Sequence, residues 1–261
     1  MKTALVDGDL LPYRMGFAAE ETTYLTDDGE VFATLGQAKK HCSTNDMDVS
    51  SITVQTEAEP LSHALKLVKN VLLRVKDRTG CKSMRIFLGG STNFRTDIAT
   101  IKEYKGGRDR KPIHYQAIRN YLIEVHDAEV VEGMEADDAL GIYQDSDSCI
   151  CTIDKDLDMV EGYHYNFVTD KMYTITPGVA LKKFYTQLLT GDPVDCIQGV
   201  PLIGKVKAAK ILSKCADEED LFYACLEQYN QKYEKPLDAM TENGQLLWIL
   251  REPEAMWTPA Y

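Results

Sequence analysis

Carboxylates gather at four places along this chain, with a spacing that could bind divalent metal ions. Glu135 and Asp138 stand three residues apart in MEADDAL, with Asp137 beside them, and residues at this spacing share one face of a helix. The remaining acids follow apolar runs or begin a helical segment: Asp7, Asp154, Asp156, Asp192 and Asp195. Half-buried carboxylates are costly unless cations pair with them, and most Lys and Arg lie elsewhere. Oxygen ligands alone suit Mg²⁺ or Mn²⁺ better than zinc.

Each group of acids has an ordinary explanation when it is considered alone. Acids near the start of a helix interact favourably with the helix dipole, and loops such as DKD are commonplace. Four groups that all lie at an expected strand end or helix start are harder to explain in this way. We therefore expect a metal site.

Apolar runs are expected to form the strands that position these acids, at 3–7, 84–90, 128–133 and 148–154. A long helix between the first two is predicted by the helical spacing of Leu61, Leu65, Val68, Leu72 and Val75. Alternation of strand and helix indicates a parallel α/β sheet, in which sites form at the carboxyl ends of strands. After residue 177 the pattern turns helical. The polar residues 20–57 show only a hairpin turn, at TDDGE.

A basic stretch lies between the second strand and the acids. The net charge of −12 argues against a nucleic-acid partner, but residues 95–119 hold seven Lys or Arg and three acids. Two glycines beside Lys105 and Arg108 permit close approach of the backbone, and Tyr104 could stack on a base. A solvated loop would have a similar composition. A basic stretch beside an acidic cluster is nevertheless what a metal-dependent enzyme acting on a polyanion requires.

The segment GVPLIGKVKAAKIL has the pattern of a helix–hairpin–helix. Its hairpin and helix start comprise Gly199, Val200, Ile203, Gly204, Lys205 and Lys207. Hairpin amides and a helix N-terminus can bind a phosphate backbone without reading its sequence. A plain helical turn would also use Gly and Pro, but the lysines after the second glycine favour nucleic-acid binding.

The cysteine content and the N-terminal residues indicate the compartment. The seven cysteines are an odd number without CxxC pairs, which favours reduced thiols in a cytosol-like compartment and disfavours zinc. No apolar run approaches the ~20 residues of a membrane span. Asp7 interrupts what would be the hydrophobic part of a signal peptide.

Five segments occur together in the order of a known superfamily. They are LVDGDLLPYR, NFRTDIATIKEYKGGRDRKP, EGMEADDALG, TIDKDLDMV and TGDPVDCIQGVPLIGKVKAAKIL. By these motifs the chain resembles the 5′-nuclease superfamily, which includes flap endonucleases, phage 5′–3′ exonucleases and the 5′-nuclease domain of bacterial DNA polymerase I. The resemblance covers most of residues 3–212. It leaves out residues 20–57 and the tail after about 215.

The resemblance implies a PIN-like α/β catalytic domain over residues 1–176 and a helical region over 177–261. A helical arch is expected around 95–120 and a helix–hairpin–helix motif around 192–214. The implied activity is 5′–3′ exonuclease and flap endonuclease cleavage of DNA, and of RNA in RNA–DNA hybrids, by a two-metal mechanism that leaves 5′-phosphates. The implied partners are DNA with free 5′ ends and replication proteins. The implied location is cytoplasmic, in the bacterial host for a phage enzyme.

Carried over by position, the resemblance assigns eight acids to two Mg²⁺ or Mn²⁺ ions: Asp7, Glu135, Asp137, Asp138, Asp154, Asp156, Asp192 and Asp195. It assigns Lys105, Arg108 and Arg95 to the arch, in contact with the scissile phosphate, and Arg14 to a nearby phosphate. Residues 199–204 correspond to a duplex clamp whose carbonyls hold a K⁺ ion. Glu132 lies outside the matching motif and is expected to be a surface or strand-end acid.

One position departs from the family pattern. The family has an Asp directly after its second strand, where this chain has Gly90, and Asp97 lies seven residues further on. Loss of that carboxylate leaves an alternative: a structure-selective DNA-binding module with impaired cleavage. The remaining acids favour an active enzyme, because their charge would repel phosphate in a pure binder. An RNA-directed PIN-like nuclease is disfavoured, because that group lacks the helix–hairpin–helix segment.

Overall fold

The computed structural model describes residues 1–106, 110–259 and 261. The chain divides into two compact units, of which the first comprises Met1–Leu10, Leu72–Arg110 and Leu122–Tyr261. The second comprises Leu11–Val71 and Lys111–Tyr121. This division differs from the boundary expected at residue 176, because the C-terminal helices fall in the same unit as the sheet.

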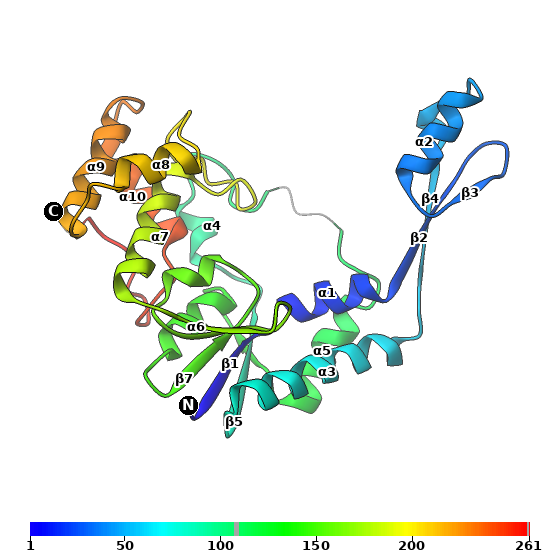
Figure 1. Ribbon diagram of the computed structural model, residues 1–261, viewed down its shortest axis with the longest axis horizontal. Helices are drawn as coiled ribbons and strands as arrows, with labels where there is room; N and C mark the ends of the chain where they lie inside the picture. The colour runs from blue at the N-terminus through cyan, green and yellow to red at the C-terminus, as the bar shows by residue number, and fades with distance from the viewer. Residues whose placement is uncertain (107–109, 260) are drawn as a thin grey trace. The chain divides into compact units, whose positions relative to one another are not determined.

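Six strands form the sheet of the first unit: β1 (Thr3–Asp7), β5 (Ser83–Gly89), β6 (Glu129–Val131), β7 (Ser148–Cys151), β8 (Gly162–Asn166) and β9 (Lys171–Ile175). Their order is β6-β5-β1-β7-β8-β9, and β5, β1 and β7 can be followed in Figure 1. All neighbours are parallel except β8 and β9. The predicted parallel α/β sheet is confirmed, and β9 adds an antiparallel edge to it.

The central strands are apolar on both faces. In β7 all four residues are buried, and in β1 every residue after Thr3 is buried. Continuous apolar strands of this kind are typical of parallel sheets that are covered on both sides. Because β1 pairs in parallel with β5 and β7, the carboxyl-terminal ends of all three strands lie side by side. We call this side of the sheet, where the strands end, the sheet edge.

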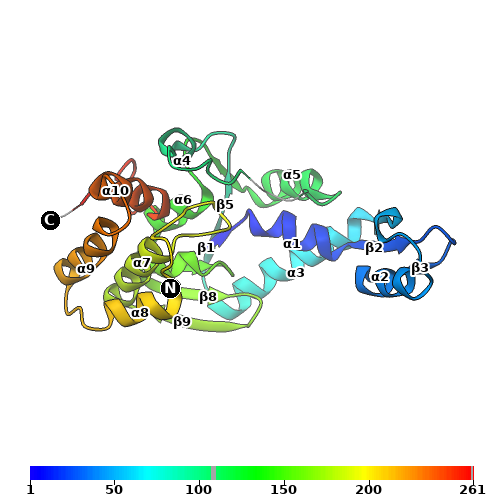
Figure 2. The same cartoon turned by 90° about the horizontal axis from the view of Figure 1, so that it is seen from above.

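Helices of the first unit follow the sheet strands in the chain: α4 (Phe94–Ile98), α6 (Ala136–Tyr143), η2 (Asp156–Met159), α7 (Pro177–Thr190), α8 (Lys205–Leu212), α9 (Glu218–Asn230) and α10 (Pro236–Leu247). Figure 2 shows α7 to α10 grouped together. Their shared core includes Phe184, Leu188, Phe222 and Met240, and Met159 from the sheet region joins it. This common core explains why the helical region and the sheet form one unit.

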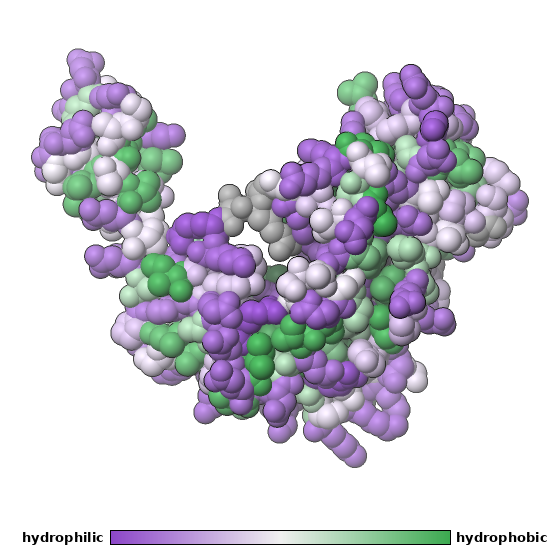
Figure 3. Space-filling view, turned by 180° about the vertical axis from the view of Figure 1, so that it is seen from behind, coloured by the Kyte–Doolittle hydropathy of each residue, from purple (hydrophilic) through white to green (hydrophobic). Residues whose placement is uncertain are grey.

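The second unit contains α1 (Leu10–Ala18), β2 (Glu20–Leu25), β3 (Val31–Phe32), α2 (Leu35–Thr44), η1 (Val49–Ser51) and β4 (Thr53–Ala58). Two further helices, α3 (Leu61–Thr79) and α5 (Tyr115–His126), begin in it and end in the first unit. The predicted hairpin turn is confirmed, since β2 pairs with β3 and Thr26 N donates to Glu30 O at 3.0 Å. The surface formed by β2, β3, α2 and β4, at the upper left of Figure 3, mixes polar and apolar residues. None of the described helices is long and apolar enough to cross a membrane.

A tight hairpin joins α7 to α8, and two glycines make it possible. Gly191 and Gly199 both have positive φ, of 66° and 59°. A Cβ placed on Gly199 would lie 2.2 Å from Gly191 N. The backbone at Gly191 and the backbone at Gly199 can therefore approach this closely only because neither residue has a side chain.

Replacement of Gly199 by Ala tests this close approach. We expect a loss of about 1–3 kcal/mol in the free energy of unfolding from the positive φ alone, and more from the overlap with Gly191. Denaturant unfolding measures it. Gly178→Ala is the matched control, because a Cβ there meets nothing within 4 Å. Equal stability of the two variants would contradict the expected steric conflict.

Candidate metal and nucleic-acid site

The edge of the sheet collects acids from distant parts of the chain. Asp7 is the last residue of β1, and Asp154 follows β7 and precedes η2. After β6, Glu135 is the N-cap of α6 and Asp137 lies in its first turn. The topology therefore places these acids where the strand-end rule predicts them.

Asp7 lies buried among these acids. Its residue is only 3% exposed, and Oδ2 accepts a hydrogen bond from Thr152 Oγ1 at 2.8 Å. Burial and then the charge of Asp9 raise the pKa of Asp7 to about 7, although the Thr152 hydrogen bond lowers it. A carboxylate that holds its proton near neutral pH lacks sufficient positive charge beside it.

Repulsion connects Asp7 to the other acids. Burial and the charges of Asp7 and Asp154 raise the pKa of Asp137 well above its usual value. Burial also raises the pKa of Asp154, and the charges of Asp156 and Asp192 add to this. Acids from β1, α6, the loop after β7 and the turn after α7 thus share one electrostatic field.

Basic side chains contact part of the cluster. Lys105 Nζ forms an ion pair with Glu135 Oε1 and lies 3.5 Å from Asp195 Oδ2. On the other side, Lys183 Nζ and Gln187 Nε2 contact Asp156 Oδ1 at 3.2 and 2.7 Å. Within the described ranges, no three His, Cys, Asp or Glu side chains converge as a metal-binding group. In this conformation, lysines therefore supply some of the positive charge that a metal ion could supply.

The chemistry of the donors nevertheless fits Mg²⁺ or Mn²⁺. Asp7, Asp137, Asp154 and Asp192 offer carboxylate oxygens, which these ions prefer. Burial and mutual repulsion raise the pKa of all four. The described lysines therefore leave repulsion in the cluster that a divalent cation would relieve.

Asp138 and Arg95 pair with each other rather than with ligands. Arg95 donates to both carboxylate oxygens of Asp138, at 2.6 and 2.8 Å, and also to Leu246 O and Trp248 O. The amides of Glu135 and Leu250 complete the partners of Asp138, which is fully buried. Burial alone would lower the pKa of Arg95, but the Asp138 bonds raise it above its ordinary value.

This pair corrects two sequence-based assignments. Arg95 is 2% exposed, so its guanidinium does not reach a phosphate at the surface. The oxygens of Asp138 are occupied by four donors, so it stabilises the start of α6 instead of facing the other acids. A bidentate ion pair inside the protein is strong because both groups are shielded from water.

Tyr104 also differs from its expected role. It is 9% exposed and belongs to the core that contains Phe184. Its hydroxyl lies 3.1 Å from Glu135 Oε2 and from Asp195 Oδ2, and can donate to either. Its ring is therefore unavailable to stack on a base, and its hydroxyl positions two acids.

Of the remaining expected contacts with nucleic acid, Gly199, Val200 and Ile203 are buried, so the structure does not support contacts from these three residues, and the others are exposed or outside the described residues. Lys205 and Lys207 lie exposed in the first turn of α8, and Gly204 is its N-cap. Val200 and Ile203 are buried beneath this hairpin. Arg14 is exposed on α1, which belongs to the second unit. The predicted contact at Arg108 lies outside the described residues.

Sequence reasoning missed several polar residues around the acids. Thr152 donates to Asp7, and Asn93 Nδ2 donates to Glu135 Oε1 at 2.9 Å. Asp9 acts on Asp7 through its charge. Its position two residues after Asp7 in LVDGDLL was a usable signal, whereas Asn93 approaches Glu135 only through the fold.

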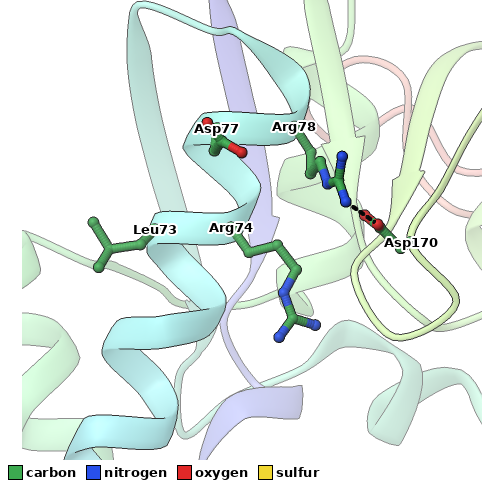
Figure 4. A pocket seen from close by; sticks show the side chains of 5 residues that line it. All are labelled: Leu73, Arg74, Asp77, Arg78 and Asp170. Atoms are coloured by element: carbon green, nitrogen blue, oxygen red, sulfur yellow. Dashed lines mark ion pairs between the residues drawn. The ribbon is translucent and has the colours of Figure 1, made fainter.

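A pocket elsewhere in the first unit contains none of these acids. Figure 4 shows its lining: Leu73, Arg74, Asp77, Arg78 and Asp170. Arg78 pairs with Asp170 at 2.6 Å, and Arg74 donates to Phe167 O at 3.3 Å. Both arginines are thus used to connect α3 to the β8–β9 hairpin, and the pocket is not the candidate site.

Replacement of Arg95 by Met tests the buried ion pair. We expect a loss of about 3–5 kcal/mol in the free energy of unfolding, because Asp138 is left charged and buried. Thermal or denaturant unfolding measures it. Lys2→Met is the control: it breaks the exposed pair with Asp147 and should change stability little. Similar effects of both substitutions would refute a structural role for Arg95.

The raised acid pKa values predict how stability depends on pH without metal. Asp7 has a higher pKa when folded than its usual 3.8, so the folded chain retains a proton that the unfolded chain loses. The free energy of unfolding should therefore fall as pH rises from about 4 to about 7. Melting temperatures measured in EDTA across this window test it. Asp7→Asn should flatten the decline, and a rise in stability over this window would contradict the expectation.

Two curated proteins match the chain in sequence, while no family model matches. The chain is 28% identical to DNA polymerase I of Bacillus subtilis, over 60% of this chain and 20% of that protein. It is 29% identical to a 5′-3′ exonuclease of Buchnera aphidicola, over 60% of this chain and 61% of that protein. The chain thus spans less than two thirds of the length of either relative.

A solved structure matches nearly the whole fold. It is a flap endonuclease of bacteriophage T5 in a complex with DNA and metal ions, with a TM-score of 0.55 and 15% identity. The match covers 95% of this chain and 89% of that one. Motif order, sequence relatives and fold therefore agree, and the resemblance of this chain to the 5′-nuclease superfamily is confirmed.

Proposed function

We propose that this chain is a divalent-metal-dependent 5′-nuclease that hydrolyses phosphodiester bonds of DNA. The single observation that carries the proposal is the set of repelling carboxylates at the sheet edge. Such a set is costly for a folded protein, and it is useful where cations and a phosphate must be held together. The sequence relatives named as DNA polymerase I and 5′-3′ exonuclease support the same reaction class.

Seven acids are proposed to hold two Mg²⁺ or Mn²⁺ ions: Asp7, Glu135, Asp137, Asp154, Asp156, Asp192 and Asp195. When bound, two ions can activate the attacking water and stabilise the leaving 3′-oxygen. The product then carries a 5′-phosphate. The protein keeps the acids in place through Thr152 on Asp7 and Asn93 on Glu135. Asp138 is omitted because Arg95 occupies its oxygens.

Lys105 is proposed to act on the phosphate after metal binds. Its ammonium now pairs with Glu135, and its amide donates to Asp195 O at 3.1 Å. With metal bound to the carboxylates of Glu135 and Asp195, the Lys105 ammonium would be released from them. A released lysine beside the cluster can stabilise negative charge that develops on the phosphate.

The hairpin before α8 is proposed to bind the duplex backbone. Gly204 leaves the first amides of α8 without a side-chain cap, and Lys205 and Lys207 are exposed beside them. This arrangement contacts phosphates without reading bases. A K⁺ ion held by hairpin carbonyls is part of the same proposal, although Tyr233 already donates to Gly199 O.

The proposed substrates are nucleic acids with free 5′ ends, in the form of duplex DNA, DNA flaps and RNA–DNA hybrids. The proposed partners are replication proteins, and the proposed location is the cytoplasm. Digestion of each 5′-labelled substrate with Mg²⁺ tests the proposal. We expect cleavage that EDTA abolishes and that Asp154→Asn lowers at least about a hundredfold. Cleavage without metal would overturn it. Salt-sensitive DNA binding without cleavage in Mg²⁺ or Mn²⁺ would instead support the alternative of a binding module.

Lys105→Met separates phosphate stabilisation from metal binding. We expect cleavage to fall about 10²–10³-fold, while the Mg²⁺ concentration at half-maximal rate stays the same or decreases. The reason is that removal of the ammonium removes a competitor for Glu135. Lys2→Met is the control for the loss of a lysine, because Lys2 precedes β1 and pairs with Asp147, at the opposite end of β1 from Asp7. A large increase in the Mg²⁺ requirement of Lys105→Met would contradict this role.

A further inference from the structure

The side-chain space of Gly90 is already filled. A Cβ placed on Gly90 would lie 2.3 Å from Glu132 Cδ and 2.4 and 2.5 Å from its two oxygens. Real Cβ atoms do not approach other atoms so closely. An Asp at position 90, which the family pattern expects, would therefore require Glu132 to move.

Glu132 uses its carboxylate to hold the turn after β5. Its Oε2 accepts from the amides of Ser91 and Thr92 at 2.9 and 3.3 Å, and from their hydroxyls at 3.2 and 3.1 Å. The Ser91 amide is the main cause that lowers the pKa of Glu132. Gly133 N donates to Thr92 Oγ1 in the same turn. Glu132 is thus more than the surface acid that was expected, and its role is structural.

Asp9 brings a different carboxylate to this edge of the sheet. Its Oδ2 accepts from Gly89 N, at the end of β5, at 2.9 Å. A Cβ on Gly89 would lie 2.9 Å from that oxygen and 3.8 Å from Ala136 N, the first residue of α6. The carboxylate of Asp9 and the start of α6 therefore both lie close to Gly89, at the end of β5. Asp9 follows Asp7, the last residue of β1, by two positions, and its hydrogen bond to Gly89 N holds its carboxylate at the end of the neighbouring strand β5.

We propose that Asp9 supplies, from the loop after β1, the carboxylate that the family pattern places after β5. Asp9 then serves the same metal site as Asp7 and Asp137, and Gly90 marks a relocated ligand instead of a lost one. Glu132 secures the turn and occupies the space that a side chain at position 90 would take. The inference rests on the proposed function, since it requires that the cluster binds metal.

Metal binding without substrate tests the inference, by calorimetric titration of the full chain with Mn²⁺. Asp9→Asn keeps the shape of the side chain and an acceptor for Gly89 N and removes a negative charge beside Asp7, so its metal-free melting temperature should equal or exceed that of wild type. We expect at least a tenfold weaker Mn²⁺ affinity. Glu132→Gln is the matched control, and its affinity should stay within about twofold. If Asp9→Asn lowers the metal-free melting temperature, the Mn²⁺ affinity of Asp9→Ser is measured in its place and compared with Glu132→Gln.

Rescue variants test the steric part. In the Asp9→Asn background, Gly90→Asp alone should leave Mn²⁺ binding weak, because Glu132 fills the space. Addition of Glu132→Ala should restore affinity to within a few fold of wild type. Rescue by Gly90→Asp alone would overturn the steric argument, and failure of the triple variant would overturn the relocation.

The outcomes distinguish this inference from the proposed function. If wild type binds no Mn²⁺, the proposed metal site is wrong. If wild type binds Mn²⁺ and Asp7→Asn weakens it, but Asp9→Asn does not, the metal site stands and the inference about Asp9 is wrong. Loss of affinity in Glu132→Gln equal to that in Asp9→Asn would assign the relocated ligand to Glu132 instead.

Discussion

Repulsion between buried and half-buried carboxylates is the constraint on which the rest of this structure depends. Asp7, Asp137 and Asp154 all have raised pKa values: Asp7 and Asp154 raise the pKa of Asp137, and Asp154 also raises that of Asp7. Such groups separate or take up protons unless the fold holds them. Here the parallel strands hold Asp7 and Asp154 close together. Asp7 is the last residue of β1, and Asp154 closely follows β7, which pairs with β1. The cost of the cluster is therefore met by the pairing and packing of the central strands.

The protein offsets this negative charge in two ways. Arg95 and Asp138 form a buried ion pair. Arg95 also donates to Trp248 O, so the pair connects the start of α6 to the loop after α10. Lys105 pairs with Glu135 on a half-buried surface, in contact with Asp195. The first pair is permanent because separation would leave a buried charge. The second can exchange, because its partners remain accessible to a competing cation.

At the end of β5, carboxylates from other elements occupy the space beside residues that have no side chain. Its last residue, Gly89, and the following Gly90 carry no side chains, and carboxylates from elsewhere occupy the adjacent space. Asp9 comes from the loop after β1, and Glu132 follows β6. Each accepts hydrogen bonds from the backbone it approaches. Both glycines are thus explained by their neighbours in space and not by their neighbours in the chain.

The sequence by itself determined the strand–helix order of the sheet region outside residues 20–57, the parallel sheet except for its strand β9, and the placement of acids at strand ends. These features depend on apolar periodicity and on local spacing, which are visible in one dimension. It did not reveal that Arg95 meets Asp138, that Tyr104 turns inward to the acids, or that Glu132 fills the space of Gly90. Only the tertiary structure decided these, because each contact joins residues at least 31 positions apart. A charged side chain has the same appearance in a sequence whether it faces solvent or a buried partner, and packing alone separates the two.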